Sequence, residues 1–123
     1  PEVLPPAEIL FQNFPAGKPT IVGYSAKWDE TTFEYQNTVR TFQFPESDRL
    51  LLEKLNNICL KCWSAFNLRG YARVDFRIDS DNQPYVLEVN ANPCISPDSG
   101  FYQAALRSGY SFTEVVQRII NDR

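Results

Sequence analysis

The pattern of apolar and polar positions is most regular between residues 72 and 90. Residues 72–79 alternate strictly between charged and apolar side chains, the charged ones being Arg73, Asp75, Arg77 and Asp79. This period of two predicts a strand that buries one face. A second apolar run at residues 85–90 predicts another strand, and the polar residues 80–83 between the two predict a hairpin loop.

The expected register of this hairpin gathers polar side chains on one face. If residue 79 faces residue 84 across the loop, Asp75 faces Glu88. In the same register Arg73 faces Asn90. Facing carboxylates repel each other and need a compensating charge. Arg73 could supply part of it, but Asp, Glu and Asn together offer the oxygen ligands that Mg²⁺ or Mn²⁺ prefers. The alternative is a solvated polar face with a surface salt bridge.

Helical periodicity appears in three further segments. Residues 46–67 predict the clearest helix, with Gly70 as its terminator, because their apolar side chains fall on one stripe. Residues 100–107 predict a short helix that Gly109 closes. Ser111 and Glu114 have the spacing of a capping box at the start of a last helix through Ile120.

The amino-terminal third has weaker signals. Residues 9–11 and the β-branched residues 20–24 predict short strands. Residues 25–39 have little periodicity and predict an ordered loop, which Trp28, Phe33 and Tyr35 would pin. The whole order predicts an α+β fold in which an antiparallel sheet is backed by helices on one face.

Composition favours a single domain over residues 1–123 in the cytoplasm. The net charge is −3 and no Lys/Arg run occurs, which disfavours nucleic acid as a partner. No apolar run is long enough for a membrane span, and no leader precedes the domain. Cys59 and Cys62 lie in an apolar helical pattern and are expected to be reduced core residues. The chain has no Met and starts at Pro1, so we expect it to be cut from a longer enzyme.

The absence of His restricts the chemistry. A zinc site is disfavoured, and neither Ser96 nor Ser99 has an obvious base to activate it as a nucleophile. An EF-hand beginning at Asp79 is excluded, because its sixth position is Pro84 and its twelfth is Asn90. Any catalysis must therefore rest on metal, carboxylates and cations, or on a nucleophile that His does not activate.

These residues resemble a known family. Arg73-Val74-Asp75, then Glu88-Val89-Asn90-Ala91-Asn92-Pro93, then Ser99, Gly100 and an Ala-containing helix are similar to the carboxy-terminal core of ATP-grasp ligases. The most similar branch is that of the D-alanine–D-alanine ligase-related proteins. The resemblance extends over about residues 3–120, and the hairpin is its most specific part.

The resemblance implies roles for the hairpin residues. Asp75, Glu88 and Asn90 would be the ligands that hold Mg²⁺, or Mn²⁺, on the phosphates of ATP. Glu88 would thereby also bind the nucleotide. Arg73 would stabilise an acyl phosphate and the tetrahedral intermediate that follows it; its alternative role is to neutralise the two carboxylates.

The resemblance also implies roles for two loops. Lys27 would reach the nucleotide phosphates, with Trp28 beside it at the nucleotide site. Ser99 would bind the carboxylate of the second substrate, and the backbone amide near Cys94 would bind an oxyanion. The family tends to have Gly at the position of Cys94, so this loop departs from the pattern. Asp98 could even favour an amine or cationic group on the substrate.

The sequence therefore predicts the carboxy-terminal part of an ATP- and Mg²⁺-dependent carboxylate–amine ligase that acts through an acyl phosphate. We expect this piece alone to fold without catalysing ligation. Its expected partners are a small amino acid or amine and the rest of its own chain, and a homodimer stays open. The alternatives are a nucleotide- and metal-binding module without turnover, or an interaction domain with an acidic hairpin.

Overall fold

The structure is a computed structural model that describes residues 1–122. It contains two compact units, one formed by residues 7–43 and the other by residues 1–6 together with the chain from Phe44 onwards. The contacts within each unit determine its local structure, and each unit is described by itself. Whether both belong to one domain, as the sequence predicts, stays a prediction.

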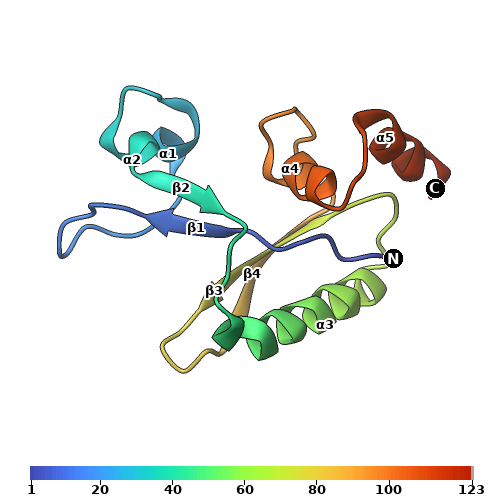
Figure 1. The fold of residues 1–123 in the computed structure, drawn as a ribbon, viewed down its shortest axis with the longest axis horizontal. Helices are drawn as coiled ribbons and strands as arrows, with labels where there is room; N and C mark the ends of the chain where they lie inside the picture. Colours follow the sequence, from blue (N-terminus) through green and yellow to red (C-terminus); the bar gives the residue numbers. More distant parts are fainter. Residues whose placement is uncertain (123) are drawn as a thin grey trace. The chain divides into compact units, whose positions relative to one another are not determined.

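The smaller unit is a two-stranded sheet with two short helices inserted between its strands (Figure 1). Strand β1 (Glu8–Phe11) pairs antiparallel with β2 (Thr38–Thr41), so that Glu8 faces Thr41 and Phe11 faces Thr38. The inserted helices are α1 (Tyr24–Trp28) and α2 (Phe33–Gln36). The prediction of a strand at residues 9–11 is confirmed.

Two other predictions for this unit are wrong. Residues 20–23 form no strand, and Tyr24 already begins α1. The β-branched composition is insufficient here because strand propensity depends on a partner strand, and β1 pairs with β2 instead. The predicted loop at residues 25–39 contains most of α1, all of α2 and the start of β2. Trp28 does not pin it, since 70% of this residue is exposed.

The larger unit begins with the long helix that the sequence predicts. A 3₁₀ turn, η1 (Glu46–Asp48), leads into α3 (Arg49–Ala65). The residue that terminates α3 is Asn67 rather than Gly70: Asn67 has φ 49°, and the amides of Asn67 and Leu68 donate to the carbonyls of Ser64 and Trp63. This pattern is a Schellman motif with Asn in the left-handed position. The cysteines of α3, Cys59 and Cys62, are free and half-buried.

The hairpin of β3 (Arg73–Ile78) and β4 (Pro84–Asn90) contains a bulge that the alternation pattern does not reveal. Asp75 faces Glu88 as predicted, but Phe76 faces Val86, so Leu87 is the extra residue. At the loop, Ile78 rather than Asp79 faces Pro84, which corrects the starting assumption of the predicted register.

The bulge has a physical reason. With strict alternation, Glu88 and Val86 would lie on the same face of β4. The extra residue at Leu87 moves Val86 and Pro84 to the face of Phe76 and Ile78, while Glu88 stays on the polar face. One face of the hairpin then contains the apolar pairs and the other contains the facing carboxylates.

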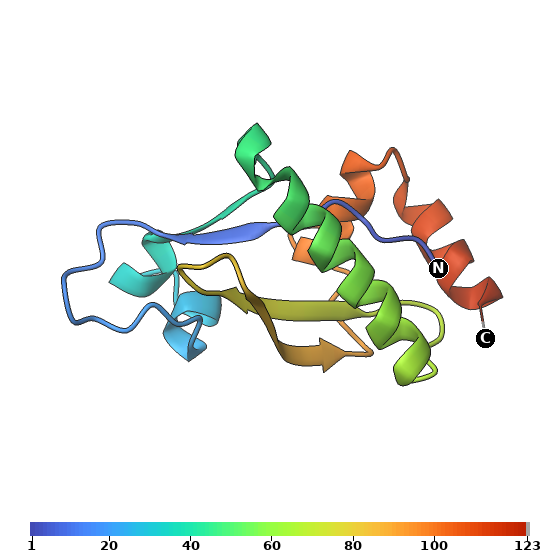
Figure 2. The same cartoon turned by 90° about the horizontal axis from the view of Figure 1, so that it is seen from below.

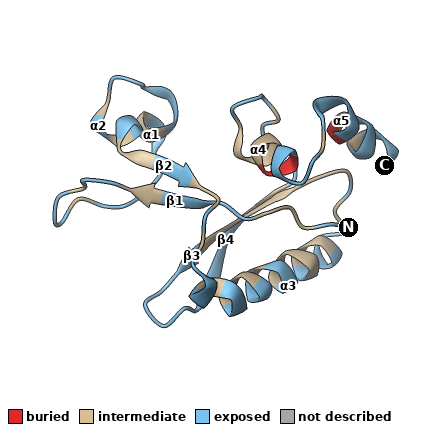
Figure 3. Ribbon diagram, viewed as in Figure 1, coloured by how far each residue is buried: buried red, intermediate tan, exposed pale blue. Residues whose placement is uncertain are grey.

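Helices α4 (Gly100–Arg107) and α5 (Phe112–Asn121) complete this unit and contain the buried residues Ala104, Ala105 and Val115. Figure 3 shows buried segments in red on α4 and α5. The predicted end of α4 at Gly109, with φ 87°, is confirmed. The capping box is confirmed as well, because Ser111 and Glu114 exchange both of its hydrogen bonds.

Helix α3 runs alongside the hairpin in both Figure 1 and Figure 2. Lys54 of α3 donates to the Gln83 side chain at the hairpin loop, with 2.9 Å between Nζ and Oε1. The α+β class is confirmed, although the strands divide between two small antiparallel sheets. Within residues 1–122 no helix combines the length and apolarity that a membrane span requires.

Candidate functional site

The polar face of the β3–β4 hairpin brings together the residues that the sequence predicts. Arg73 and Asp75 form a two-point ion pair, with 2.7 Å from Nε to Oδ1 and 2.9 Å from Nη2 to Oδ2. Both side chains are about a third to two fifths exposed. The hydrogen bonds to Asp75 are the main reason why the pKa of the Arg73 guanidinium is raised, and the charges of Asp75 and Glu88 add to this. A guanidinium does not deprotonate in proteins, so Arg73 is a cation here.

Glu88 and Asn90 lie on β4 opposite this pair, Glu88 facing Asp75 and Asn90 facing Arg73. Glu88 is exposed, whereas Asn90 is half-buried. The side-chain oxygen of Asn90 accepts a hydrogen bond from the backbone amide of Asn92 at 2.9 Å. Asn92 is held in turn by the hydroxyl of Tyr71, which donates to its Oδ1 at 2.9 Å. These contacts fix the end of β4 and the orientation of the Asn90 amide.

The donor set fits a hard divalent cation. Among residues 1–122 no three His, Cys, Asp or Glu side chains gather into a group that could hold a metal. Two facing carboxylates and the Asn90 amide nevertheless provide oxygen ligands of the kind that Mg²⁺ uses together with substrate phosphates. Each carboxylate oxygen has two lone pairs, so Asp75 can bind Arg73 and still accept another ligand. That these residues bind a metal stays a prediction.

The loop after β4 is held by hydrogen bonds between its own side chains. The Cys94 sulfur lies 3.1 Å from the Ser96 hydroxyl, which lies 2.7 Å from Oδ1 of Asp98. Hydrogen bonding to Ser96 lowers the pKa of the exposed Cys94 thiol. Pro93 is buried and anchors the start of this loop. The loop therefore presents a thiol and a carboxylate beside the end of the hairpin.

Ser99 lies at the N-cap of α4. Its Oγ accepts a hydrogen bond from the backbone amide of Tyr102 at 3.3 Å. The hydroxyl hydrogen can still donate, so capping and substrate binding are compatible at this residue. Its predicted role in binding a carboxylate stays untested.

Lys27 and Trp28 lie on α1 in the smaller unit, and both are exposed. They belong to a different compact unit from the hairpin residues. The structure therefore brings Arg73, Asp75, Glu88 and Asn90 together, while Lys27 and Trp28 form a separate part of the predicted site.

Sequence reasoning missed two sets of contacts. Tyr71 and Asn92, which are 21 residues apart, were not recognised as support for the hairpin. Lys18 was overlooked as well, although its ammonium group lies 2.7 Å from Glu34. The only signal in the sequence was a cluster of aromatic residues around a lone Lys, which predicts no particular contact.

A shallow apolar depression lies next to Glu88 on β4. Its lining residues are Phe66, Leu68, Val86, Leu87, Glu88, Val89 and Ala91. The bulge exposes Leu87 at this position, with 63% of the residue accessible. A shallow apolar surface of this kind can pack against an aromatic ring.

Two solved structures are similar to this chain in both fold and sequence. A crystal structure of D-alanine–D-alanine ligase from Bacillus anthracis covers 97% of this chain and 34% of its own length, with a TM-score of 0.66 and 26% identity. A structure of D-alanine–D-alanine ligase from the same organism complexed with ATP covers 71% of this chain and 30% of its own, with a TM-score of 0.62 and 29% identity.

Sequence relatives agree with these structures. D-alanine–D-alanine ligase of Vesicomyosocius okutanii is 35% identical over 99 residues, which are 76% of this chain and 34% of that protein. The chain spans 19% to 34% of the length of such curated relatives. The family model described as "D-ala D-ala ligase C-terminus" matches residues 2–121. With nearly all of its length matched, the chain belongs to the D-alanine–D-alanine ligase carboxy-terminal family.

Proposed function

We propose that the intact protein is an ATP- and Mg²⁺-dependent ligase that joins a carboxylate to an amine through an acyl phosphate. The observation that carries this proposal is the polar face of the hairpin. On this face Arg73 forms an ion pair with Asp75, and Glu88 and Asn90 lie opposite them on β4. Family membership and the ATP complex of the Bacillus anthracis ligase support it.

In the proposed reaction a carboxylate substrate attacks the γ-phosphate of ATP, which gives an acyl phosphate and ADP. An amine then attacks the acyl carbon, and inorganic phosphate leaves. Mg²⁺, held by Asp75, Glu88 and Asn90, would neutralise the phosphate oxygens when bound. The shallow depression lined by Leu87 would receive the nucleotide ring, since it lies directly beside Glu88.

Arg73 is prepared for the charge that develops in both steps. Two of its five N–H groups bind Asp75, so three remain for oxygens of the reacting group. Its geometry is fixed before substrate binds, and a preoriented donor needs no reorganisation during the reaction. Lys27 would contribute a further cation from the smaller unit, with Trp28 packed on the nucleotide.

The loop from Asn92 to Gly100 is proposed to select the amine-bearing substrate. Asp98 places a carboxylate in this loop, and Ser99 can donate from the N-terminus of α4. A negative group here would favour an acceptor with a cationic part, so D-alanine need not be the substrate.

The test uses the full-length protein, Mg²⁺ and a panel of D- and L-amino acids and small amines, with ADP release and ligated product as readouts. We expect at least one pair of substrates to give both. Glu88→Gln should reduce turnover by about 10²-fold or more at saturating ATP, because a charged ligand to the phosphate-bound cation is lost.

The matched control is Glu53→Gln, which removes an exposed carboxylate on α3 and should leave turnover unchanged. Normal turnover by the Glu88→Gln protein would contradict the proposal. ATP binding without any product from the panel would instead favour the module without turnover, in which the Arg73–Asp75 pair is structural.

A further inference from the structure

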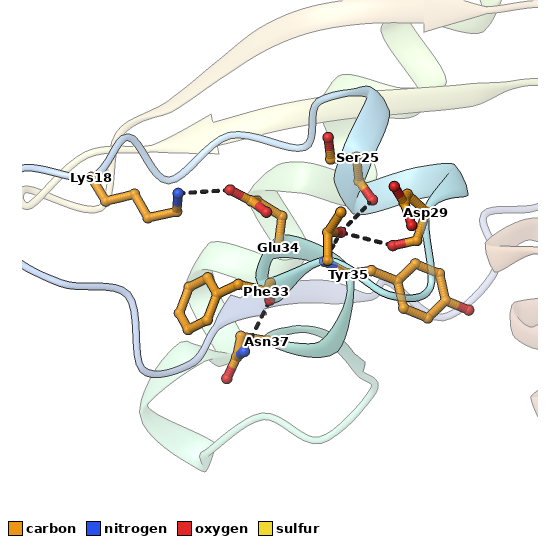
Figure 4. Close-up of polar contacts among 8 residues, drawn as sticks. Lys18, Ser25, Asp29, Phe33, Glu34, Tyr35 and Asn37 are labelled. Carbon is orange, nitrogen blue, oxygen red and sulfur yellow. Dashed lines mark hydrogen bonds and ion pairs between the residues drawn. The ribbon is translucent and has the colours of Figure 1, made fainter.

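The Lys18 side chain has an environment that distinguishes it from an ordinary surface lysine. Its Nζ lies 2.7 Å from Oε1 of Glu34 on α2. The same ammonium group lies 5.8 Å from the ring centre of Phe14 and 5.7 Å from that of Phe33. Figure 4 shows Lys18 reaching across to Glu34. The cation is therefore enclosed by one carboxylate and two aromatic rings.

Partial burial strengthens these contacts. The Lys18 and Glu34 side chains are 31% and 32% exposed, so both are partly withdrawn from water. The rings of Phe14 and Phe33 also touch each other, with centroids 5.3 Å apart. An ion pair and a cation–π contact in this setting act together to fasten the segment around Lys18 to α2.

Helix α2 is connected in turn to α1. The Thr32 hydroxyl lies 2.7 Å from the Asp29 carbonyl and 3.1 Å from the Ser25 carbonyl, which places it against the end of α1. Thr32 also caps α2 by accepting from the Tyr35 amide. One residue thus joins the two short helices.

Helix α1 has little else to stabilise it. It has five residues and no side-chain cap, and a helix of this length is unstable in isolation. Its aromatic residues Tyr24 and Trp28 are 79% and 70% exposed, so burial contributes little. Its conformation must therefore depend on its attachment to α2.

We infer that Lys18 is a positioning residue for α1, the helix that presents Lys27 and Trp28. The Lys18–Glu34 ion pair beside the Phe14 and Phe33 rings fixes α2, and Thr32 passes that constraint to α1. The consequence for ATP binding rests on the proposed function, whereas the ordering of α1 does not.

The experiment compares full-length Lys18→Met, Lys18→Arg and the wild type by hydrogen exchange without nucleotide. Met keeps the length of the side chain and removes the charge. We expect amides of residues 24–29 to exchange about 3- to 10-fold faster in Lys18→Met, a loss in the range of one ion pair plus a cation–π contact. Lys18→Arg should restore exchange to within about twofold, because the charge remains.

Two controls locate the effect. Lys61→Met removes an exposed lysine of α3 and should leave residues 24–29 unchanged. Glu34→Gln should accelerate the same amides, but less than Lys18→Met does, because the contacts of Lys18 with the two rings remain. The double variant should add little to Lys18→Met, since the ion pair is already lost there. Amides of β1 and β2 should keep their wild-type exchange rates, since the hydrogen bonds between these two strands are not altered.

Kinetics provide the second readout. We expect Lys18→Met to raise the KM for ATP by a similar 3- to 10-fold while kcat changes by less than about twofold, because Lys27 is misplaced but not removed. Unchanged exchange at residues 24–29, or equal acceleration in β1 and β2, would overturn the inference. Faster exchange at residues 24–29 in a protein that never releases ADP would support the positioning role and reject the proposed ligase function.

Discussion

At the scale of single residues, hydrogen-bond partners decide the chemistry of the polar groups. Arg73 uses two N–H groups on Asp75 and keeps three, so one side chain can both stabilise the hairpin and face a substrate. Lysine could not do both, because its ammonium group is a point charge without a planar fork. The neighbouring carboxylate of Glu88 adds a negative charge to this face, so the face can bind a cation as well as the anionic group that Arg73 contacts.

Cys59 and Cys94 should differ strongly in reactivity. Burial raises the pKa of Cys59 to about 11, whereas hydrogen bonding to Ser96 lowers that of the exposed Cys94 thiol from 9.0. Because the thiolate is the nucleophile, iodoacetamide at pH 7.5 should modify Cys94 first. Peptide mass spectrometry over a time course measures the order.

In denaturant the difference between these cysteines should disappear, since their surroundings are then equal. Equal labelling of Cys59 and Cys94 in the folded protein would contradict the lowered pKa at Cys94. Loss of activity in step with Cys94 modification would further support a role of its loop in substrate binding.

At the scale of elements, short local motifs define where helices end. Asn67 adopts φ 49° at the end of α3, and two backbone hydrogen bonds close the helix there. The left-handed conformation is accessible to Asn and Gly but is strained for β-branched residues. This turn also leads the chain from α3 into the loop before β3, so it helps to place the hairpin.

Substitution of Asn67 should therefore depend on the shape of the new side chain. We expect Asn67→Val to lower the free energy of unfolding by about 1–2 kcal/mol, and Asn67→Gly to leave it equal or slightly higher. Urea unfolding followed by circular dichroism measures both. Asn57→Val, in the middle of α3, is the control for helix propensity alone and should cost about 0.5 kcal/mol or less relative to Asn. Equal effects of Val at the two positions would contradict the motif.

At the scale of the whole molecule, the described residues bury few large apolar side chains. Apart from Pro84 and Pro93, the buried apolar residues among those described are Ala104, Ala105 and Val115, whereas Leu50, Phe66 and Leu87 are each more than 60% exposed. Exposed apolar area of this extent is typical of surfaces that contact other protein. The relatives, of which the chain spans 19% to 34%, have further sequence that could provide such contacts.

The chain of residues 1–123 by itself should therefore fold, bind a hydrophobic dye such as ANS, and lack ligase activity. Helix α3 and the hairpin supply its secondary structure, while the exposed apolar residues supply dye-binding surface. Circular dichroism, ANS fluorescence and an ADP-release assay with added amino acids test the three statements. Formation of ADP and ligated product by this chain alone would contradict the prediction, as would an absence of dye binding.

The sequence by itself determined those features that depend on neighbouring residues. The alternation at residues 72–79, the helix after residue 46, the Gly109 terminus and the Ser111–Glu114 capping box were all predictable. Each results from side-chain period or from backbone groups within a few residues of each other. The pairing of Asp75 with Glu88 was predictable for the same reason, because a hairpin brings nearby residues together.

Only the tertiary structure decided the features that depend on distant contacts or on competing preferences. The bulge at Leu87 reflects a conflict between polar and apolar faces that alternation alone does not resolve. Residues 20–24 read as a strand, but β1 takes β2 as its partner. Lys18 and Glu34 are 16 residues apart and Tyr71 and Asn92 are 21 apart, so their contacts exist only once the chain has folded. Such pairs cannot be predicted from neighbouring residues alone, because they depend on which distant segments pack together.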